Sequence, residues 1–290
     1  MKISEFYNGS GTVLSFEVFP PKKDSPVQTV YNALEEMAGL SPKPAFISVT
    51  YSAGGTGGAK ESTIELASFV KNKLGIETAA HLTCLNSSAD DIKQILYSLS
   101  EHNIENILAL RGDRNPDIQE NGSYSYASDL IKYIKHSLPN AGIMAACCPE
   151  GHPESEDIVA DVRNLKKKVD AGAEVLISQM FFDNEKFYDF KERLRLADIN
   201  VPVSAGIMPV TNKRQFERMI MLSGASLPSK FTRTFSRYED KPEALADAGI
   251  AYAIDQIVDL VSNGADGIHL YTMNKPAVAR KITESVRSLL

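Results

Sequence analysis

A carboxylate, Glu17, lies inside an apolar run, SFEVF, which Pro20 and Pro21 follow. An ionised carboxylate is costly to bury unless it has a partner or a chemical role. Burial alone would raise its pKa, and a carboxylic acid with a raised pKa can donate a proton near neutral pH. The sequence therefore predicts either a general acid at Glu17 or a buried carboxylate paired with a lysine or arginine.

A second run, LALRGD at 108–113, ends in an arginine, a glycine and a carboxylate. The guanidinium of Arg111 could bind a phosphate or carboxylate through two hydrogen bonds, and Asp113 could accept hydrogen bonds from a heterocycle. An Arg111–Asp113 pair that stabilises a turn is the structural alternative. His81, in AAHLTC, has no local partner, and such a histidine is more often a satisfied core residue than a ligand.

Asp161, Asn164 and Lys168 are spaced i, i+3 and i+7, so on a helix they share one face. Such a face is usually solvated, but beside a binding site it could hold a ribose and a diphosphate. The glycine-rich segment SAGGTGGAK (52–60) matches neither common nucleotide-binding fingerprint. It therefore predicts a flexible lid rather than a phosphate loop.

The elements that must position these residues begin with eight short apolar segments. They are nearly continuous in hydrophobicity rather than alternating, which is typical of strands buried on both faces of a parallel sheet. The predicted strands are 11–19, 45–51, 78–85, 106–112, 142–148, 174–182, 201–208 and 267–272.

Helical patterns separate the predicted strands. The segment 155–171 carries an apolar stripe and ends at Gly172, as helices commonly do. The other predicted helices are about 26–39, 61–74, 89–102, 125–138, 184–196, 212–223, 243–263 and 276–289.

Strands that alternate with helices favour a (β/α)8 TIM barrel over a doubly wound open sheet. The long segment 209–266 predicts an extra helical excursion between strands seven and eight, so residues 1–290 are expected to form a single domain. Functional residues of such barrels lie at the carboxyl ends of strands. The polar residues there are Glu17, Thr50, Tyr51, His81, Thr83, Arg111, Asp113, Glu150, His152, Gln179, Asp183, His269 and Tyr271.

The composition, 43% hydrophobic and 23% charged, is that of a soluble globular protein and excludes disordered, collagen-like and coiled-coil chains. A net charge of −6 lacks the basic footprint of proteins that bind nucleic acid or anionic membranes, so a small-molecule partner is expected. There is no secretory signal and no membrane-spanning run, which predicts a cytoplasmic protein.

The three cysteines and the scattered histidines predict neither a disulfide framework nor a metal site. Cys147 and Cys148 are predicted to be small core residues rather than nucleophiles, because no histidine is paired with either nearby in the sequence.

Ten segments, mostly at predicted strand ends, resemble methylenetetrahydrofolate reductases, flavoproteins of one-carbon metabolism and methionine biosynthesis. They are SFEVFPPK (15–22), FISVTY (46–51), HLTC (81–84), ALRGD (109–113), YASDL (126–130), PEGHPE (149–154), NLKKKVDAGA (164–173), SQMFFD (178–183), GIMPV (206–210) and YTMN (271–274). The resemblance covers the catalytic barrel alone, as in the shorter bacterial members of the family.

This resemblance implies that FAD binds in the barrel mouth and takes a hydride from NADH or NADPH. After the oxidised nicotinamide leaves, the hydride passes to 5,10-methylenetetrahydrofolate and gives 5-methyltetrahydrofolate, in a ping-pong mechanism. Glu17 matches the family's general acid, Asp113 its aspartate near the flavin pyrimidine and the pterin, and Gln179 its glutamine that contacts folate and nicotinamide. Assembly into a homo-oligomer is left open.

Further contacts are implied by the same resemblance. Those to FAD are Thr50, Tyr51, Ala53, His81, Arg111, Gly112, Ala127, His152, Asp161, Asn164 and Lys168, and Gln215 lies on the folate side.

Four positions depart from the family pattern. Cys148 replaces a tyrosine beside FAD, and Lys167 replaces an arginine in the FAD helix. Met219 stands where a phenylalanine stacks on the substrate, and Lys275 where an arginine can reach the folate glutamate. These departures are expected to change FAD affinity and folate recognition rather than the reaction class.

Two alternative functions fit a barrel of this kind. One is another flavin-dependent barrel oxidoreductase, similar to proline dehydrogenase. The other is a folate-binding methyltransferase barrel that lacks flavin. The visible absorbance of the purified protein separates the flavin-free methyltransferase barrel from the two flavoproteins. Folate turnover then separates a methylenetetrahydrofolate reductase from another flavin-dependent oxidoreductase.

Overall fold

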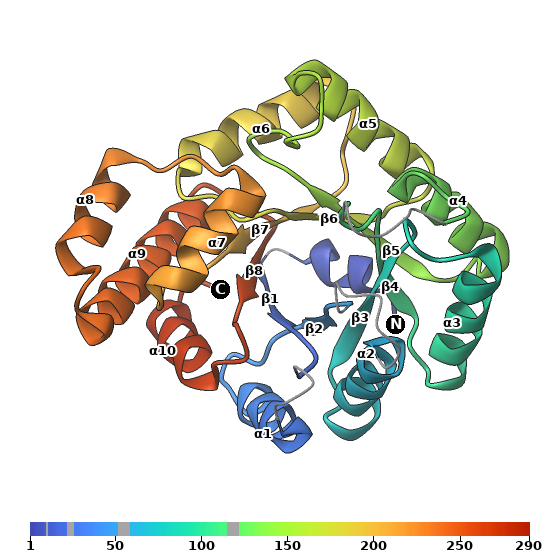
Figure 1. Ribbon diagram of the computed structural model, residues 1–290, viewed down its shortest axis with the longest axis horizontal. Helices are drawn as coiled ribbons and strands as arrows, with labels where there is room; N and C mark the ends of the chain where they lie inside the picture. Colours follow the sequence, from blue (N-terminus) through green and yellow to red (C-terminus); the bar gives the residue numbers. More distant parts are fainter. Residues whose placement is uncertain (10, 22–25, 52–58, 115–121) are drawn as a thin grey trace.

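Eight parallel strands close into a barrel in which each strand pairs with the next and β8 pairs with β1 (Figure 1). A computed structural model describes residues 1–9, 11–21, 26–51, 59–114 and 122–290. The strands are β1 Val13–Val18, β2 Phe46–Val49, β3 Glu77–Thr83, β4 Asn106–Leu110, β5 Gly142–Cys147, β6 Val175–Ser178, β7 Val203–Ile207 and β8 Gly267–Tyr271. The predicted strands and the closed barrel are confirmed, and the open sheet is wrong.

Helices surround the barrel (Figure 1). They are α1 Val27–Ala38, α2 Ala59–Ser68, η2 Phe69–Lys73, α3 Ala89–Glu101, α4 Ala127–Ser137, α5 Ile158–Asp170, α6 Asn184–Leu196, α7 Lys213–Ser223, α8 Ser229–Tyr238, α9 Pro242–Ser262 and α10 Pro276–Val286. Side-chain caps fix several starts: Asp157 accepts a hydrogen bond from the Ala160 amide in α5, and Asn212 accepts one from the Gln215 amide in α7. Three helices, α7, α8 and α9, lie between β7 and β8.

A short 3-10 helix, η1 (Ile3–Asn8), closes the amino-terminal end of the barrel (Figure 1). The buried Ile3 donates its amide to Asn106 Oδ1 at 2.8 Å, and the Tyr7 hydroxyl lies 2.7 Å from Ser204 Oγ. Both partners are at strand beginnings. The interior is therefore sealed at this end, and the opposite rim is the open one.

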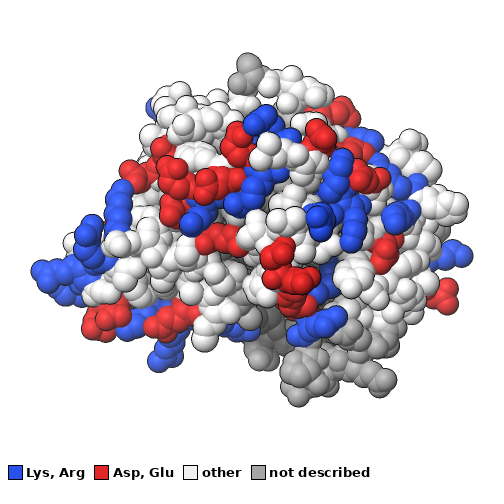
Figure 2. All heavy atoms as spheres, turned by 90° about the horizontal axis from the view of Figure 1, so that it is seen from above, with Lys and Arg blue, Asp and Glu red and all other residues white. Residues whose placement is uncertain are grey.

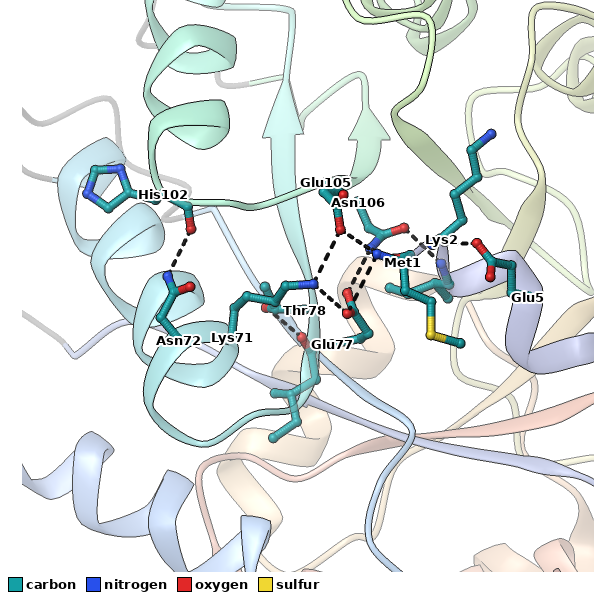
Figure 3. Close-up of polar contacts among 12 residues, drawn as sticks. Met1, Lys2, Glu5, Lys71, Asn72, Glu77, Thr78, His102, Glu105 and Asn106 are labelled. Carbon is teal, nitrogen blue, oxygen red and sulfur yellow. Dashed lines mark hydrogen bonds and ion pairs between the residues drawn. The ribbon is translucent and has the colours of Figure 1, made fainter.

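A polar network surrounds this seal (Figure 3). Lys71 forms ion pairs with Glu77 and Glu105, and the amino group of Met1 contacts Glu105 as well. Asn106 donates to the Met1 carbonyl at 3.0 Å and to Glu77 Oε2 at 3.3 Å. The amino-terminal rim is therefore occupied by structural contacts.

The barrel interior changes character along its axis. Next to η1 it is apolar, with a cluster of Ile3, Val13, Phe46, Ala79, Leu108, Met144, Val175 and Ile177. Farther along the strands the buried interior residues are polar, among them Ser15, Ser48, His81 and His269. Buried polar groups need partners, so the open end is where ligand chemistry is expected.

On the outer surface, Lys and Arg side chains are interspersed with Asp and Glu across the face shown in Figure 2. Within the described part of the chain, no helix has the length and apolar character required to cross a membrane.

Candidate active site

Glu17 lies at the end of β1 among residues from two other strands. Pairing of β1 with β8 sets Ser15 opposite His269 and Glu17 opposite Tyr271. Glu17 Oε2 is 3.4 Å from Nε2 of His81 and 3.6 Å from Nε2 of His269, and the Glu17 side chain is 17% exposed. The carboxylate is thus largely buried, and its partners are two imidazoles rather than the lysine or arginine of the structural alternative.

These imidazoles reverse the expected titration of Glu17. Burial alone would raise the pKa of Glu17, as the sequence predicts. The rings of His269 and His81 stabilise the carboxylate more than burial destabilises it, and together they lower the pKa to about 2. The prediction of a raised pKa is therefore wrong for this barrel.

The ring of His269 is held on every side. Ser15 Oγ lies 2.8 Å from Nδ1, Ser48 Oγ lies 3.3 Å from Nε2, and the ring stacks on Phe46. The sequence places His269 at a strand end but predicts no role for it. The alternation of GIHLYT, which turns His269 and Tyr271 to the same side of β8, is the signal that could have indicated one.

His81 differs from His269 because part of its ring is unsatisfied. The residue is 7% exposed, and its Nε2 has no hydrogen-bond partner among the described residues, although Glu17 is near. His81 is therefore buried as a core residue, as predicted, but its ring is not fully satisfied. A buried, unpaired nitrogen at the open end of a barrel indicates a place where a ligand can bind.

Arg111, just after β4, forms a bidentate ion pair with Glu154. Nη1 and Nη2 each donate to a different carboxylate oxygen at 2.7 Å. The partner proposed in the structural alternative, Asp113, is exposed and follows Gly112, whose φ is +92°. The sequence predicts no role for Glu154, and its place at the end of PEGHPE is the only local signal.

The predicted face of α5 is present, and each member has a contact. Asp161 accepts from Ser155 Oγ at 2.8 Å, and Asn164 Oδ1 accepts from Lys167 Nζ at 2.9 Å. Lys168 Nζ donates to the Ala146 carbonyl in β5 at 2.9 Å, which directs its ammonium toward the barrel.

The loop between β5 and α5 carries Cys148 and His152. His152 Nδ1 accepts from the Glu154 amide at 3.1 Å. Burial raises the pKa of the Cys148 thiol to about 11 and that of Cys147 well above its usual value. Because a thiolate is the nucleophilic form, these shifts favour the predicted role as core residues.

The remaining predicted cofactor contacts lie near the same rim. Thr50 donates its amide to the Val18 carbonyl and accepts at its own carbonyl from Thr63 Oγ1. Tyr51 is partly buried, and Ala127 is buried at the start of α4. Ala53 and most of its glycine-rich segment lie outside the described residues.

Residues predicted on the folate side come from three segments. The Gln179 side chain accepts from the Met180 amide at 2.9 Å, just after β6. Gln215 and Met219 lie on α7, where Met219 packs against an aromatic cluster that includes Phe182, Phe216 and Phe231. Lys275 Nζ donates to Thr211 Oγ1 at 2.8 Å, and burial lowers its pKa.

The structure thus brings Glu17, His81 and His269 into one cluster and pairs Arg111 with Glu154. Tyr271 contacts this cluster through an edge-to-face arrangement with the His269 ring, with centroids 5.6 Å apart. The other predicted residues that the structure describes lie on strand ends, adjoining loops or helices. Among the described residues, no group of three or more His, Cys, Asp or Glu side chains is arranged to hold a metal ion.

Comparisons with known proteins identify related chains. The family model described as methylenetetrahydrofolate reductase matches residues 2–287. The chain is 34% identical to 5,10-methylenetetrahydrofolate reductase of Escherichia coli over 94% of this chain and 90% of that protein. It is 35% identical to methylenetetrahydrofolate reductase 1 of Schizosaccharomyces pombe and 33% identical to methylenetetrahydrofolate reductase (NADH) 1 of Arabidopsis thaliana, and spans 45% and 48% of their lengths.

A solved structure shares the fold at low sequence identity. It is an uncharacterized protein from Clostridium thermocellum that binds two copies of 5-methyl-5,6,7,8-tetrahydrofolic acid, with a TM-score of 0.68 and 13% identity over the full length of both chains. Because the family model covers nearly the whole barrel and relatives exceed 30% identity, the chain belongs to the methylenetetrahydrofolate reductase family.

Proposed function

We propose that this chain is a flavoprotein reductase that converts 5,10-methylenetetrahydrofolate to 5-methyltetrahydrofolate with NADH or NADPH, through FAD and by a ping-pong mechanism. The observation that carries the proposal is the buried cluster of Glu17, His81 and His269 at the open end of a barrel of this family. A solved barrel of the same fold that binds 5-methyltetrahydrofolic acid is compatible with folate as the ligand.

The donor set at the rim fits FAD. Arg111 and Lys168 supply two cations for a diphosphate, while Asp161 and Asn164 supply acceptors for ribose hydroxyls. His81, whose Nε2 lies 3.4 Å from Glu17 without a hydrogen bond, stands where the flavin ring can approach it. When bound, FAD supplies the hydride chemistry, which no protein side chain can perform.

The protein's own chemical task is proton delivery by Glu17. Opening the methylene bridge of the folate requires protonation of a weakly basic nitrogen. With a pKa of about 2, the Glu17 carboxyl is ionised at neutral pH, so it must take up a proton before it can deliver one. That proton reaches Glu17 through the Nε2 atoms of His81 and His269, 3.4 Å and 3.6 Å away, and Glu17 passes it to the substrate.

Asp113 has a separate electrostatic task. It is exposed at the end of β4 and its flanking Gly112 has a left-handed backbone, so a ligand can approach closely. A carboxylate there stabilises the cationic iminium that forms when the folate ring opens.

The visible absorbance of the purified protein, followed by anaerobic NADH and then methylenetetrahydrofolate, tests the function. We expect a flavin spectrum that NADH bleaches and the folate restores. A colourless protein that binds folate would support a methyltransferase-like barrel. A flavin that methylenetetrahydrofolate cannot reoxidise would support another barrel oxidoreductase.

Glu154→Gln should tighten FAD binding by about two- to fivefold. Glu154 occupies both terminal nitrogens of Arg111, so a phosphate must compete with it. The Glu154 side chain is 45% exposed, and ion pairs of this exposure contribute at most about 1 kcal/mol. Flavin fluorescence quenching measures the Kd. Glu156→Gln removes the same charge from the same loop and should have no effect; equal changes in both variants would contradict direct competition.

Lys275→Ala should raise the KM for folate several-fold and leave flavin reduction by NADH unchanged. Its ammonium is held by Thr211 beside β8, where a point charge can attract the folate glutamate. Steady-state kinetics at several salt concentrations measure the effect, with the exposed Lys93→Ala as control. If monoglutamylated and polyglutamylated folates respond equally to the substitution, electrostatic attraction of the tail is the wrong explanation.

A further inference from the structure

The turn after β8 has two successive residues in a rare backbone conformation. Met273 and Asn274 have φ values of +53° and +54°. Two other described residues other than glycine have positive φ, Asn103 and Asp198, and both follow helix ends, where this conformation is common. The 273–274 pair ends no helix. Such a conformation is unfavourable for residues other than glycine and persists where surrounding contacts enforce it.

Those contacts join the turn to the backbone just past Glu17. Asn274 Oδ1 accepts from the Phe19 amide at 3.1 Å, and Asn274 Nδ2 donates to the Phe19 carbonyl at 2.8 Å. Thr272 Oγ1 donates to the carbonyl of Glu17 at 2.7 Å. One side-chain amide therefore satisfies both polar groups of Phe19, as a neighbouring strand would.

The opposite side of this segment is held as well. The Thr50 amide donates to the Val18 carbonyl at 2.9 Å. The next two residues, Pro20 and Pro21, have no amide hydrogen to donate. Thr272 and Asn274 thus supply the hydrogen bonds that hold the end of β1 and the residue after it on the β8 side, where regular strand pairing has ended.

We propose that Asn274 is a positioning residue for Glu17. Its side-chain amide extends the β1–β8 pairing by one step and holds the backbone that carries the carboxylate at a set distance from His81 and His269. The kinetic consequence of this role rests on the proposed function, but the structural consequence does not.

The distances explain why the position of Glu17 matters. Its carboxylate oxygen is 3.4 Å and 3.6 Å from the two imidazoles, so a displacement of about 1 Å would weaken both interactions. Such misplacement can cost about 100-fold in rate even when the chemical groups are retained. Weaker contact with the imidazoles would also move the titration of Glu17 to higher pH.

Asn274→Gly removes the side-chain amide but keeps the backbone conformation, because glycine adopts positive φ without strain. Hydrogen exchange of a peptide covering residues 16–21 should accelerate at least about tenfold, because the Phe19 amide loses its acceptor. The two prolines contribute no amide signal, so few amides besides that of Phe19 are reported. Asn103→Gly, at an exposed residue with φ +59°, is the matched control and should leave this peptide unchanged.

Asn274→Asp provides a second variant. It retains an acceptor for the Phe19 amide but loses the donor to the Phe19 carbonyl, so exchange should lie between wild type and the glycine variant. In the half-reactions, Asn274→Gly should slow flavin reoxidation by methylenetetrahydrofolate about tenfold or more, shift its pH profile to higher pH and leave reduction by NADH unchanged.

Unchanged exchange in Asn274→Gly would overturn the proposal. Faster exchange with an unchanged pH profile would overturn the link to Glu17 while the proposed function stands. If wild-type protein does not reduce folate, the proposed function fails, and the link to Glu17 is then decided by the acid-induced loss of stability: a shift to higher pH in Asn274→Gly supports it, and an unchanged midpoint refutes it.

Discussion

Glu17→Gln is expected to leave reduction of bound flavin by NADH within about a few-fold of wild type and to slow reoxidation by methylenetetrahydrofolate at least about 100-fold, because general acid catalysis typically contributes 10²–10⁴-fold. Hydride transfer from nicotinamide needs no proton donor at the folate, whereas opening the methylene bridge does. Glutamine keeps the shape of Glu17 but cannot pass a proton from His81 or His269 to the substrate.

Anaerobic stopped-flow absorbance measures the two half-reactions separately. Glu217→Gln, an exposed substitution on α7, is the matched control and should change neither. If Glu17→Gln slows both half-reactions equally, Glu17 organises the flavin site rather than donating a proton. If it slows neither, another residue delivers the proton.

The strands could be predicted because each is a short, largely apolar segment that is buried on both faces, but their ends could not. The predicted strand 174–182 ends at Ser178 in the structure. Beyond it, Met180 and Phe182 join a separate cluster with residues of α7 and α8, whereas Phe181 belongs to the main core. Apolar character alone does not show which of two cores a side chain joins.

The position proposed for the candidate site follows from the rule that barrel chemistry lies at the carboxyl ends of strands. Its internal pairing did not, because the partners are distant in the chain. His269 reaches Glu17 only through closure of the barrel by β1 and β8, and Arg111 pairs with Glu154 in the loop after the neighbouring strand β5 rather than with Asp113. The partner determines the direction of a pKa shift, so the pKa of Glu17 could not be predicted without knowing which strands are neighbours in the closed barrel.

Asn274 shows the same limit at the level of the backbone. The motif YTMN marks the end of a strand, but nothing local indicates that Met273 and Asn274 both adopt positive φ. That conformation is enforced by contacts with Phe19 and Glu17, more than 250 residues earlier in the chain. Tertiary contacts therefore override the local preference of these two residues.

The contribution of Glu17 to the free energy of unfolding of the flavin-free protein should fall by about 3 kcal/mol as the pH drops from about 5 to about 2. This loss adds to the destabilisation that other acidic groups cause in the same pH range. The pKa of Glu17 is lowered from 4.5 to about 2 in the folded state, and each pKa unit corresponds to about 1.36 kcal/mol. Between these values the unfolded chain binds the proton and the folded chain does not. Stability from Glu17 is therefore complete above the unfolded pKa and is lost as the pH falls through the folded one.

Urea unfolding at several pH values measures this contribution, and Glu17→Gln should flatten that part of the curve while the exposed Glu217→Gln retains it. The result also decides where the catalytic proton is held. A flattened curve means that the imidazoles of His269 and His81 keep Glu17 ionised, so the proton must come through them. An unchanged curve would mean that the pKa of Glu17 is not depressed in solution, and the carboxyl group itself would then be the store of the proton that opens the folate ring.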